Sequence, residues 1–331
     1  MSHVASTDRL LAADTALRRR AVAAGPVVAG VTLAAAVIVT AAAGVPLRDP
    51  GGVSARRLLT TVGLLALFAG ADLLFRGGRE RWSRRRMVSA AIAVASFYVT
   101  YFAYRNLKSV VPLIRPGSLY DQGLTDLDHG LLGGHGPADV LHTLLGTGVS
   151  AQVLSAVYMF FFAFIPLSLA AALALARDED RALFFTTAIA LNWLLAAISY
   201  YLLPSIGPFH AEPGTFAQLP TTAVSHLQDR LIGERAAFLH DPSVPGSAQS
   251  IGAFASLHVS VWFTAALGAH LLRLPIPVRV VLWVLTGLTM LATVYFGWHY
   301  LLDDAAGVAI AVVALTIMRA ITGRVPRPEA A

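Results

Sequence analysis

Long apolar blocks restrict the fold of this chain more than any other feature. There are about eight blocks of bilayer length, at residues 26–46, 58–75, 87–104, 151–176, 182–203, 251–272, 280–299 and 302–319. A helix needs roughly 20 apolar residues to cross a bilayer. Only 13% of the residues are charged, whereas a soluble domain has roughly a quarter. We therefore predict an all-α integral membrane protein with about eight transmembrane helices.

The remaining composition excludes several kinds of site. The chain has no cysteine, which excludes disulfides, thiolate metal sites and a cysteine nucleophile. Its net charge of +6 could indicate nucleic acid, but the arginines cluster in short loops between apolar blocks. Such clusters set the orientation of membrane proteins. We expect the bilayer as partner, no nucleic acid and no cofactor, and no carboxylate cluster suits a metal such as Mg²⁺.

Basic residues also predict the orientation in a plasma membrane, which we expect to be bacterial. With both termini in the cytoplasm, 17 basic residues lie inside and 8 outside, as the positive-inside rule favours. The two longest connections, 105–150 and 204–250, then lie outside, with short helices expected near 119–128 and 221–239. A cleaved signal peptide is the alternative for the first block, which follows three arginines.

We expect three segments along the chain. Residues 1–86 hold a cytoplasmic N-terminus and two extra transmembrane helices, residues 87–322 a six-helix core, and residues 323–331 a cytoplasmic tail. Asp72 within the second block could mark a transport pathway, since ionisable groups inside membranes usually serve a function. A transporter or lipid-binding protein is therefore the alternative to an enzyme.

The first reactive pattern is Lys-x6-Arg-Pro at Lys108, Arg115 and Pro116. Two fixed cations could hold a phosphate, with the arginine supplying a forked set of donors. Lys108 is the only lysine in the chain, and both cations lie outside, against the inside-positive trend. The alternative is a basic cluster that contacts lipid head groups.

The second pattern, Gly-Ala-Phe-Ala-Ser-Leu-His, ends at His258, where the sixth apolar block begins. A histidine entering a membrane helix is costly and usually functional, and it could protonate a leaving oxygen. The backbone N–H groups of the helix start, near Ser256, could bind an anion. The alternative is a histidine that caps or packs between helices.

The third pattern joins His299 to Asp303, four residues later. On a continuous helix this spacing is one turn, so Asp303 could hold the imidazole in one tautomer and leave its far nitrogen free to attack. Asp303 and Asp304 also suit the first turn of a helix, and we prefer that structural role for Asp304. The charge argument places all three patterns on one side, so we expect them to form one phosphate pocket.

These patterns resemble the signature of the type-2 phosphatidic acid phosphatase superfamily, which reads Lys-x6-Arg-Pro, Pro-Ser-Gly-His and Ser-Arg-x5-His-x3-Asp. The matching residues are Lys108, Arg115, Pro116, Ser256, His258, His299 and Asp303. The resemblance covers about residues 87–320. It implies that His299 attacks phosphorus and forms a phosphohistidine, with His258 protonating the departing alcohol. It also implies that Lys108, Arg115 and Ser256 hold the phosphate of a lipid substrate.

The departures from that signature favour one branch. Ala255 and Leu257 replace the proline and glycine of the second part, and Ala292 and Thr293 replace the serine and arginine of the third. The altered motifs are similar to those of inositol phosphorylceramide synthases, which implies transfer to a lipid or polyol acceptor, with simple hydrolysis as the alternative. The pocket lacks one arginine, for which Arg105 or a residue of 204–250 could substitute.

Overall fold

The computed structural model describes residues 2–76, 82–176 and 178–323, which form helices and no strand. Seven of these helices are long and apolar enough to cross a membrane, and α11 (Leu257–Leu271) is a shorter apolar helix of 15 residues. The seven are α1 (Ser2–Ala42), α2 (Val53–Arg76), α3 (Arg84–Ile114), α6 (Val149–Leu175), α7 (Glu179–Leu202), α12 (Ile276–Tyr295) and α13 (Leu301–Thr322). The predicted all-α membrane fold is confirmed, with helices at all eight predicted positions.

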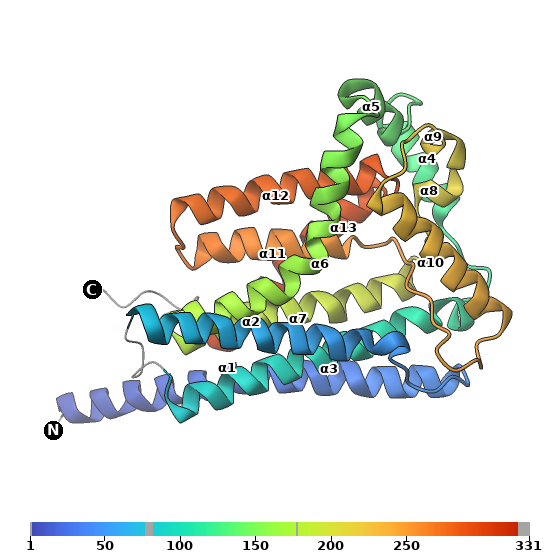
Figure 1. Cartoon of the computed structure of the whole chain (residues 1–331). Coiled ribbons are helices and arrows are strands. Elements are labelled where there is room, and N and C mark those ends of the chain that lie inside the picture. Colours follow the sequence, from blue (N-terminus) through green and yellow to red (C-terminus); the bar gives the residue numbers. More distant parts are fainter. Residues whose placement is uncertain (1, 77–81, 177, 324–331) are drawn as a thin grey trace.

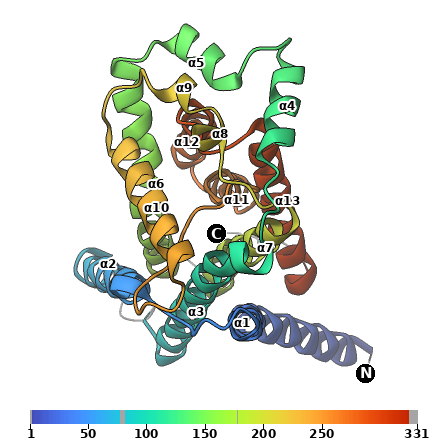
Figure 2. The same cartoon turned by 90° about the vertical axis from the view of Figure 1, so that its right-hand side faces the viewer.

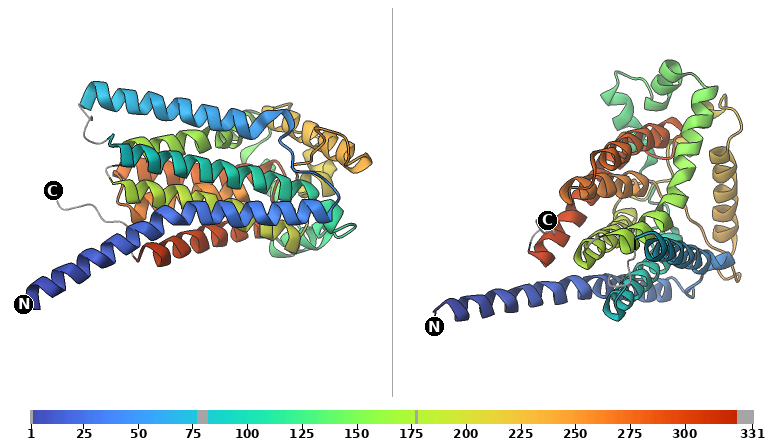
Figure 3. Two further views of the ribbon diagram at one scale, coloured as in Figure 1. Left: turned by 90° about the horizontal axis from the view of Figure 1, so that it is seen from below. Right: turned by 60° about the vertical axis from the view of Figure 1, so that its left-hand side comes forward.

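The long helices form one bundle (Figure 1). Helix α7 packs against α1, α3, α11 and α13. In its most apolar stretch of 18 residues, 78% of the residues are buried in the protein. Helix α2 packs mainly on α6 at the edge of the bundle (Figure 3). In its most apolar stretch of 18 residues, only 11% of the residues are buried in the protein. A helix that is apolar around its whole circumference and little buried in protein faces lipid. Thus α7 is the core helix, and α2 lies at the lipid boundary.

Short helices gather at one end of the bundle (Figure 2). They are η1 (Pro50–Gly52), α4 (Asp121–Leu131), α5 (Pro137–Leu145), α8 (Pro208–Ala211), α9 (Pro213–Phe216) and α10 (Ala223–His240). Helices α4 and α10 confirm the two predicted surface helices. Thr222 begins α10 with a capping box, because its side chain accepts the Ser225 N–H while the Ser225 hydroxyl accepts the Thr222 N–H. Helix α1 begins, and α13 ends, at the opposite end of the bundle (Figure 1).

Of the helix boundaries that differ from the prediction at this end, three bear on the reactive residues. Helix α3 continues ten residues past 104, and Asn106 in this extension exchanges two hydrogen bonds with the backbone of Arg48, at 2.7 and 2.9 Å. Helix α11 begins at Leu257, six residues late, where the Ser256 side chain caps it. Helix α12 stops at Tyr295, four residues early. These changes place the predicted reactive residues on helix ends and on the turns between helices.

Candidate active site

His299 lies in the break between α12 and α13. Gly297 turns the chain there with φ +66°, a conformation that favours glycine. A Cβ atom at Gly297 would lie 2.7 Å from the backbone nitrogen of Phe209, which donates to the Gly297 carbonyl at 2.9 Å. The loop that holds α8 therefore packs directly on this turn, and the turn presents a buried His299.

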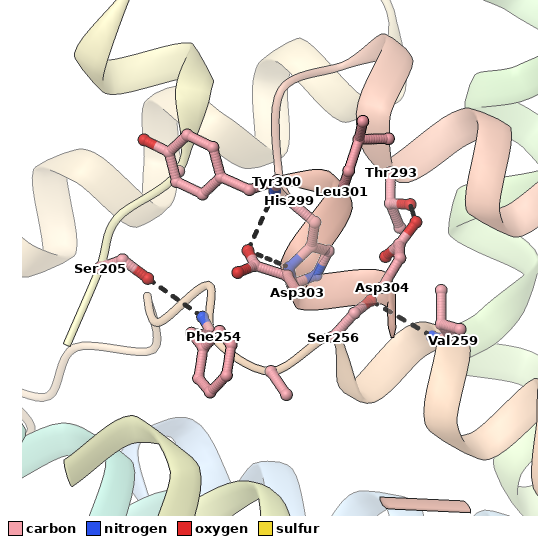
Figure 4. A network of polar contacts seen from close by, with 12 residues as sticks. Ser205, Phe254, Ser256, Val259, Thr293, His299, Tyr300, Leu301, Asp303 and Asp304 are labelled. Carbon is pink, nitrogen blue, oxygen red and sulfur yellow. Dashed lines mark hydrogen bonds and ion pairs between the residues drawn. The ribbon is translucent and has the colours of Figure 1, made fainter. Parts of the chain in front are cut away.

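Asp303 orients the imidazole of His299. One carboxylate oxygen, Oδ2, lies 3.3 Å from His299 Nδ1 and accepts the Tyr300 N–H at 3.0 Å (Figure 4). The predicted pairing thus forms across the start of α13, since His299 precedes the helix and the two residues do not share a continuous helix. Asp303 also caps α13 through the Tyr300 N–H, so the catalytic and structural alternatives apply to the same carboxylate.

Asp304 has a different partner. Its Oδ2 accepts the Thr293 hydroxyl at 3.0 Å, and Asp304 lies in the first turn of α13 as expected. Thr293 occupies the position of the arginine in the third motif. The pair therefore joins α12 to α13 with a hydrogen bond at the place where the motif would supply a cation.

Burial sets the charge of His299. It lowers the pKa of His299 to about 4, so the ring is neutral at pH 7. A neutral ring that donates its Nδ1–H to Asp303 carries a lone pair on Nε2. His299 therefore has the charge and the orientation that a nitrogen nucleophile requires.

His258 lies beside it, in the first turn of α11. Its ring packs on Tyr158 and Phe161, with centroids at 4.4 and 4.1 Å, and its centroid lies 6.0 Å from that of His299. The Nε2 atom of His258 is buried and has no hydrogen-bond partner among the described residues. This nitrogen is therefore available to bond to a group that enters the site.

Both histidines line a cavity of about 520 Å³ together with Lys108. The Lys108 ammonium lies 4.6 Å from the ring centroid of Tyr200 and 5.9 Å from that of Tyr104. Across the described parts of the chain, the ammonium has no carboxylate partner. Two imidazoles and an unpaired cation that line one cavity form a site for an oxyanion.

Residues 122–317 match the model of the family described as the PAP2 superfamily. The chain belongs to the PAP2 superfamily. This confirms the superfamily that the motifs resembled. The match contains His258, His299 and Asp303, but it begins after Lys108 and Arg115. No curated protein and no solved structure matched the chain. The match supports the superfamily alone and gives no support to the inositol phosphorylceramide synthase-like branch.

The other two predicted phosphate ligands of this PAP2 protein do not line that cavity. Arg115 lines a neighbouring cavity of about 200 Å³, which also contains Arg235, and it donates to the Tyr201 carbonyl. Tyr200 and Gly252 border both cavities and separate them. The Ser256 N–H donates to the Asp303 carbonyl at 2.9 Å (Ser256 and Asp303 are in Figure 4). Ser256 therefore joins the segment that carries His258 to the segment that carries His299.

The PAP2 cavity also contains cations that sequence reasoning missed. Arg56 and Arg57, at the start of α2, line it although the predicted division placed α2 outside the core. Arg105 and Arg230 of α10 line it too, as the sequence suggested for Arg105 and for a residue of 204–250, and the Arg105 guanidinium pairs with Asp49 at 2.5 Å. The positions of Arg56 and Arg57 at the outer end of an apolar block were a usable signal. Which helix neighbours which could not be inferred from hydropathy.

Proposed function

We propose that this PAP2 protein is a membrane phosphatase or phosphotransferase that acts on a lipid phosphate through a phosphohistidine at His299. One observation carries the proposal: His299, His258 and Lys108 line the same cavity, with Asp303 in contact with the first imidazole. Membership of the superfamily supports the same class of reaction.

The chemistry proceeds in two steps. In the first step, Nε2 of His299 forms a bond to phosphorus while the bond from phosphorus to the alcohol oxygen breaks. His258, which takes up a proton when the anionic substrate binds beside it, gives that proton to the oxygen. Lys108 stabilises the charge on the phosphoryl oxygens, and Asp303 stabilises the positive charge that develops on His299. In the second step, His258 takes a proton from the attacking hydroxyl, whose oxygen displaces His299 from phosphorus.

Transfer and hydrolysis differ only in which hydroxyl attacks in the second step. Transfer requires protection from water. Helix α10 covers part of the cavity through Leu227 and Leu231, and residues 246–252 line another part of the wall. Arg48 fixes the neighbouring segment by donating to the carbonyls of Val244 and Ser247, both at 2.9 Å. This cover supports transfer, including the inositolphosphotransferase activity that the motifs imply, over simple hydrolysis.

A trapping experiment tests the intermediate. Purified protein is mixed with a ³²P-labelled phospholipid, quenched within one turnover and tested for an acid-labile, alkali-stable protein phosphate. We expect label on the wild type and none on H299Q. We also expect turnover of H299Q to fall by at least about a thousandfold, as for other lost nucleophiles. H226Q is the matched control, because His226 is exposed on α10 and does not line the cavity.

Three outcomes would contradict the proposal. Full lipid turnover by a folded H299Q protein would exclude His299 as the nucleophile, and no turnover of any lipid phosphate by the wild type would favour a transporter or lipid-binding protein. Free phosphate or free phosphorylated head group as the sole product, with a lipid or polyol acceptor present, would exclude the transferase version and leave the hydrolase.

We also propose that the cavity faces the outside and that both termini are cytoplasmic. The short helices lie at one end of the bundle, and α1 begins and α13 ends at the other (Figure 1). The cavity lies at the end of the short helices, because Leu227, Arg230 and Leu231 of α10 line it. The arginine distribution of the sequence supports this orientation by the positive-inside rule.

A further inference from the structure

The first turn of α2 contributes two arginines to the PAP2 cavity, although α2 lies before the residues that match the family model. The guanidinium carbon of Arg57 lies 5.3 Å from the ring centroid of Tyr101 and 5.2 Å from that of Phe162. Aromatic faces attract a cation without neutralising it. Arg57 is therefore held in place on α3 and α6 with its charge retained.

Arg57 lies near the reacting groups but not among them. The Phe162 ring, which Arg57 contacts, lies 6.0 Å from the ring of His258, centroid to centroid. Tyr101 precedes Lys108 by seven residues on α3, which corresponds to roughly 10 Å along the helix. Two cation centres thus lie along one wall, with Lys108 beside the histidines and Arg57 farther along.

The charges around this wall are unbalanced. Arg105 has a carboxylate partner in Asp49, but the described residues provide no ion pair or side-chain hydrogen bond for Arg57 or Lys108. Glu234 is the one carboxylate among the described residues that line the cavity. Uncompensated cations at the edge of a low-dielectric interior are costly, so this excess favours an anionic ligand.

We propose that Arg57, with Arg56 beside it, forms a second anion subsite in this cavity. It binds a second anionic group of the substrate, while Lys108 and the histidines bind the phosphate that reacts. The substrate class is then a lipid whose head group carries two neighbouring anionic groups. The inference rests on the proposed function for its substrate.

The kinetic test uses two lipids with the same prenyl chain, one a monophosphate and the other a diphosphate. Full-length wild type, R57M and R57K are compared, because methionine keeps the packing of the arginine stem and lysine keeps the charge. For R57M we expect KM for the diphosphate to rise roughly tenfold to hundredfold, the usual effect of losing a bond to a charged group. We expect less than a threefold change for the monophosphate and partial recovery in R57K.

The control variant is R85Q. Arg85 is an exposed arginine at the other end of α3, 3.7 Å from Glu179, and does not line the cavity. An equal change for both lipids in R57M, or no change for either, would overturn the second subsite. Size-exclusion profiles and melting temperatures identify any variant that is not folded, and R57K then provides the comparison.

A binding arm separates this inference from the proposed function. Methylenediphosphonate and inorganic phosphate are titrated into H299Q, with and without R57M, and the fluorescence of Trp193 and Trp298 in the cavity wall is followed. We expect the diphosphonate to bind more tightly, and R57M to remove that preference. If the wild type turns over neither lipid but this preference holds, the proposed function fails and the subsite stands. Equal affinities for the two probes overturn the subsite.

Discussion

Substituting Asp303 with asparagine tests whether its carboxylate serves catalysis or only caps α13. The Asp303 carboxylate is fully buried, and one oxygen contacts both His299 Nδ1 and the Tyr300 N–H. An asparagine oxygen can accept from the same two groups, so D303N keeps the turn and removes the charge. That charge matters only when His299 becomes positive, which happens as it attacks phosphorus.

The distance between the two groups gives the size of the effect. At 3.3 Å and an effective dielectric constant near 20, a full charge pair is worth about 5 kcal/mol. The neutral hydrogen bond that remains in D303N is worth about 1 kcal/mol. The difference of about 4 kcal/mol corresponds to roughly a thousandfold fall in kcat, with KM nearly unchanged.

The assay measures kcat, KM and the melting temperature of the wild type, D303N and D126N. We expect the melting temperature of D303N to be equal to or above that of the wild type, because a buried charge is removed while its hydrogen bonds are kept. D126N is the matched control, since Asp126 is exposed on α4, bonds to Gln122 and does not line the cavity, and its kcat should fall less than tenfold. Activity of D303N within tenfold of the wild type would refute the electrostatic reasoning and leave Asp303 a helix cap.

Three further predictions concern the surroundings of the site. G297A should lower both the melting temperature and kcat, because φ is +66° and the new Cβ would lie 2.4 Å from a ring carbon of Phe216; unchanged kcat in detergent would contradict this. Burial raises the pKa of Asp128 to about 6, so its folded form holds a proton more tightly than the unfolded chain and stability falls as the pH rises through 6. The melting temperature of D128N should therefore exceed that of the wild type at pH 8 by a margin that shrinks toward pH 5, and a constant margin would exclude this cause. Because the chain lacks cysteine, single T143C and H270C variants can be labelled in intact cells, where we expect an impermeant maleimide to react with T143C alone; the reverse pattern would invert the orientation.

Hydropathy alone predicted the positions of the long helices, because each membrane-spanning helix requires a long run of apolar residues in the sequence. It also brought His299, His258 and Lys108 to one end of the bundle, where the structure joins them in one cavity. The predicted i, i+4 pairing of His299 with Asp303 occurs through a different backbone, since Gly297 breaks the helix before the histidine.

The contribution of α2 was not predictable in this way. Hydropathy gives the depth of a residue in the bilayer but not the order of helices in the membrane plane, which depends on packing. Arg57 could therefore be placed on the outer side but not against Phe162. For Arg115 the same limit applies, because depth alone does not reveal that Tyr200 stands between it and the histidines.

Because α2 lies at the edge of the bundle, the thickness of the surrounding bilayer can affect the position of Arg57 in the cavity. Little of the apolar surface of α2 is buried in the protein, and its first turn carries Arg57 to the cavity. A transmembrane helix at the edge of a bundle can adjust its tilt when the hydrophobic thickness of the bilayer changes. We expect thin and thick bilayers to position the Arg57 guanidinium differently. Turnover should then depend on the acyl-chain length of the surrounding lipids, even when those lipids are not the substrate.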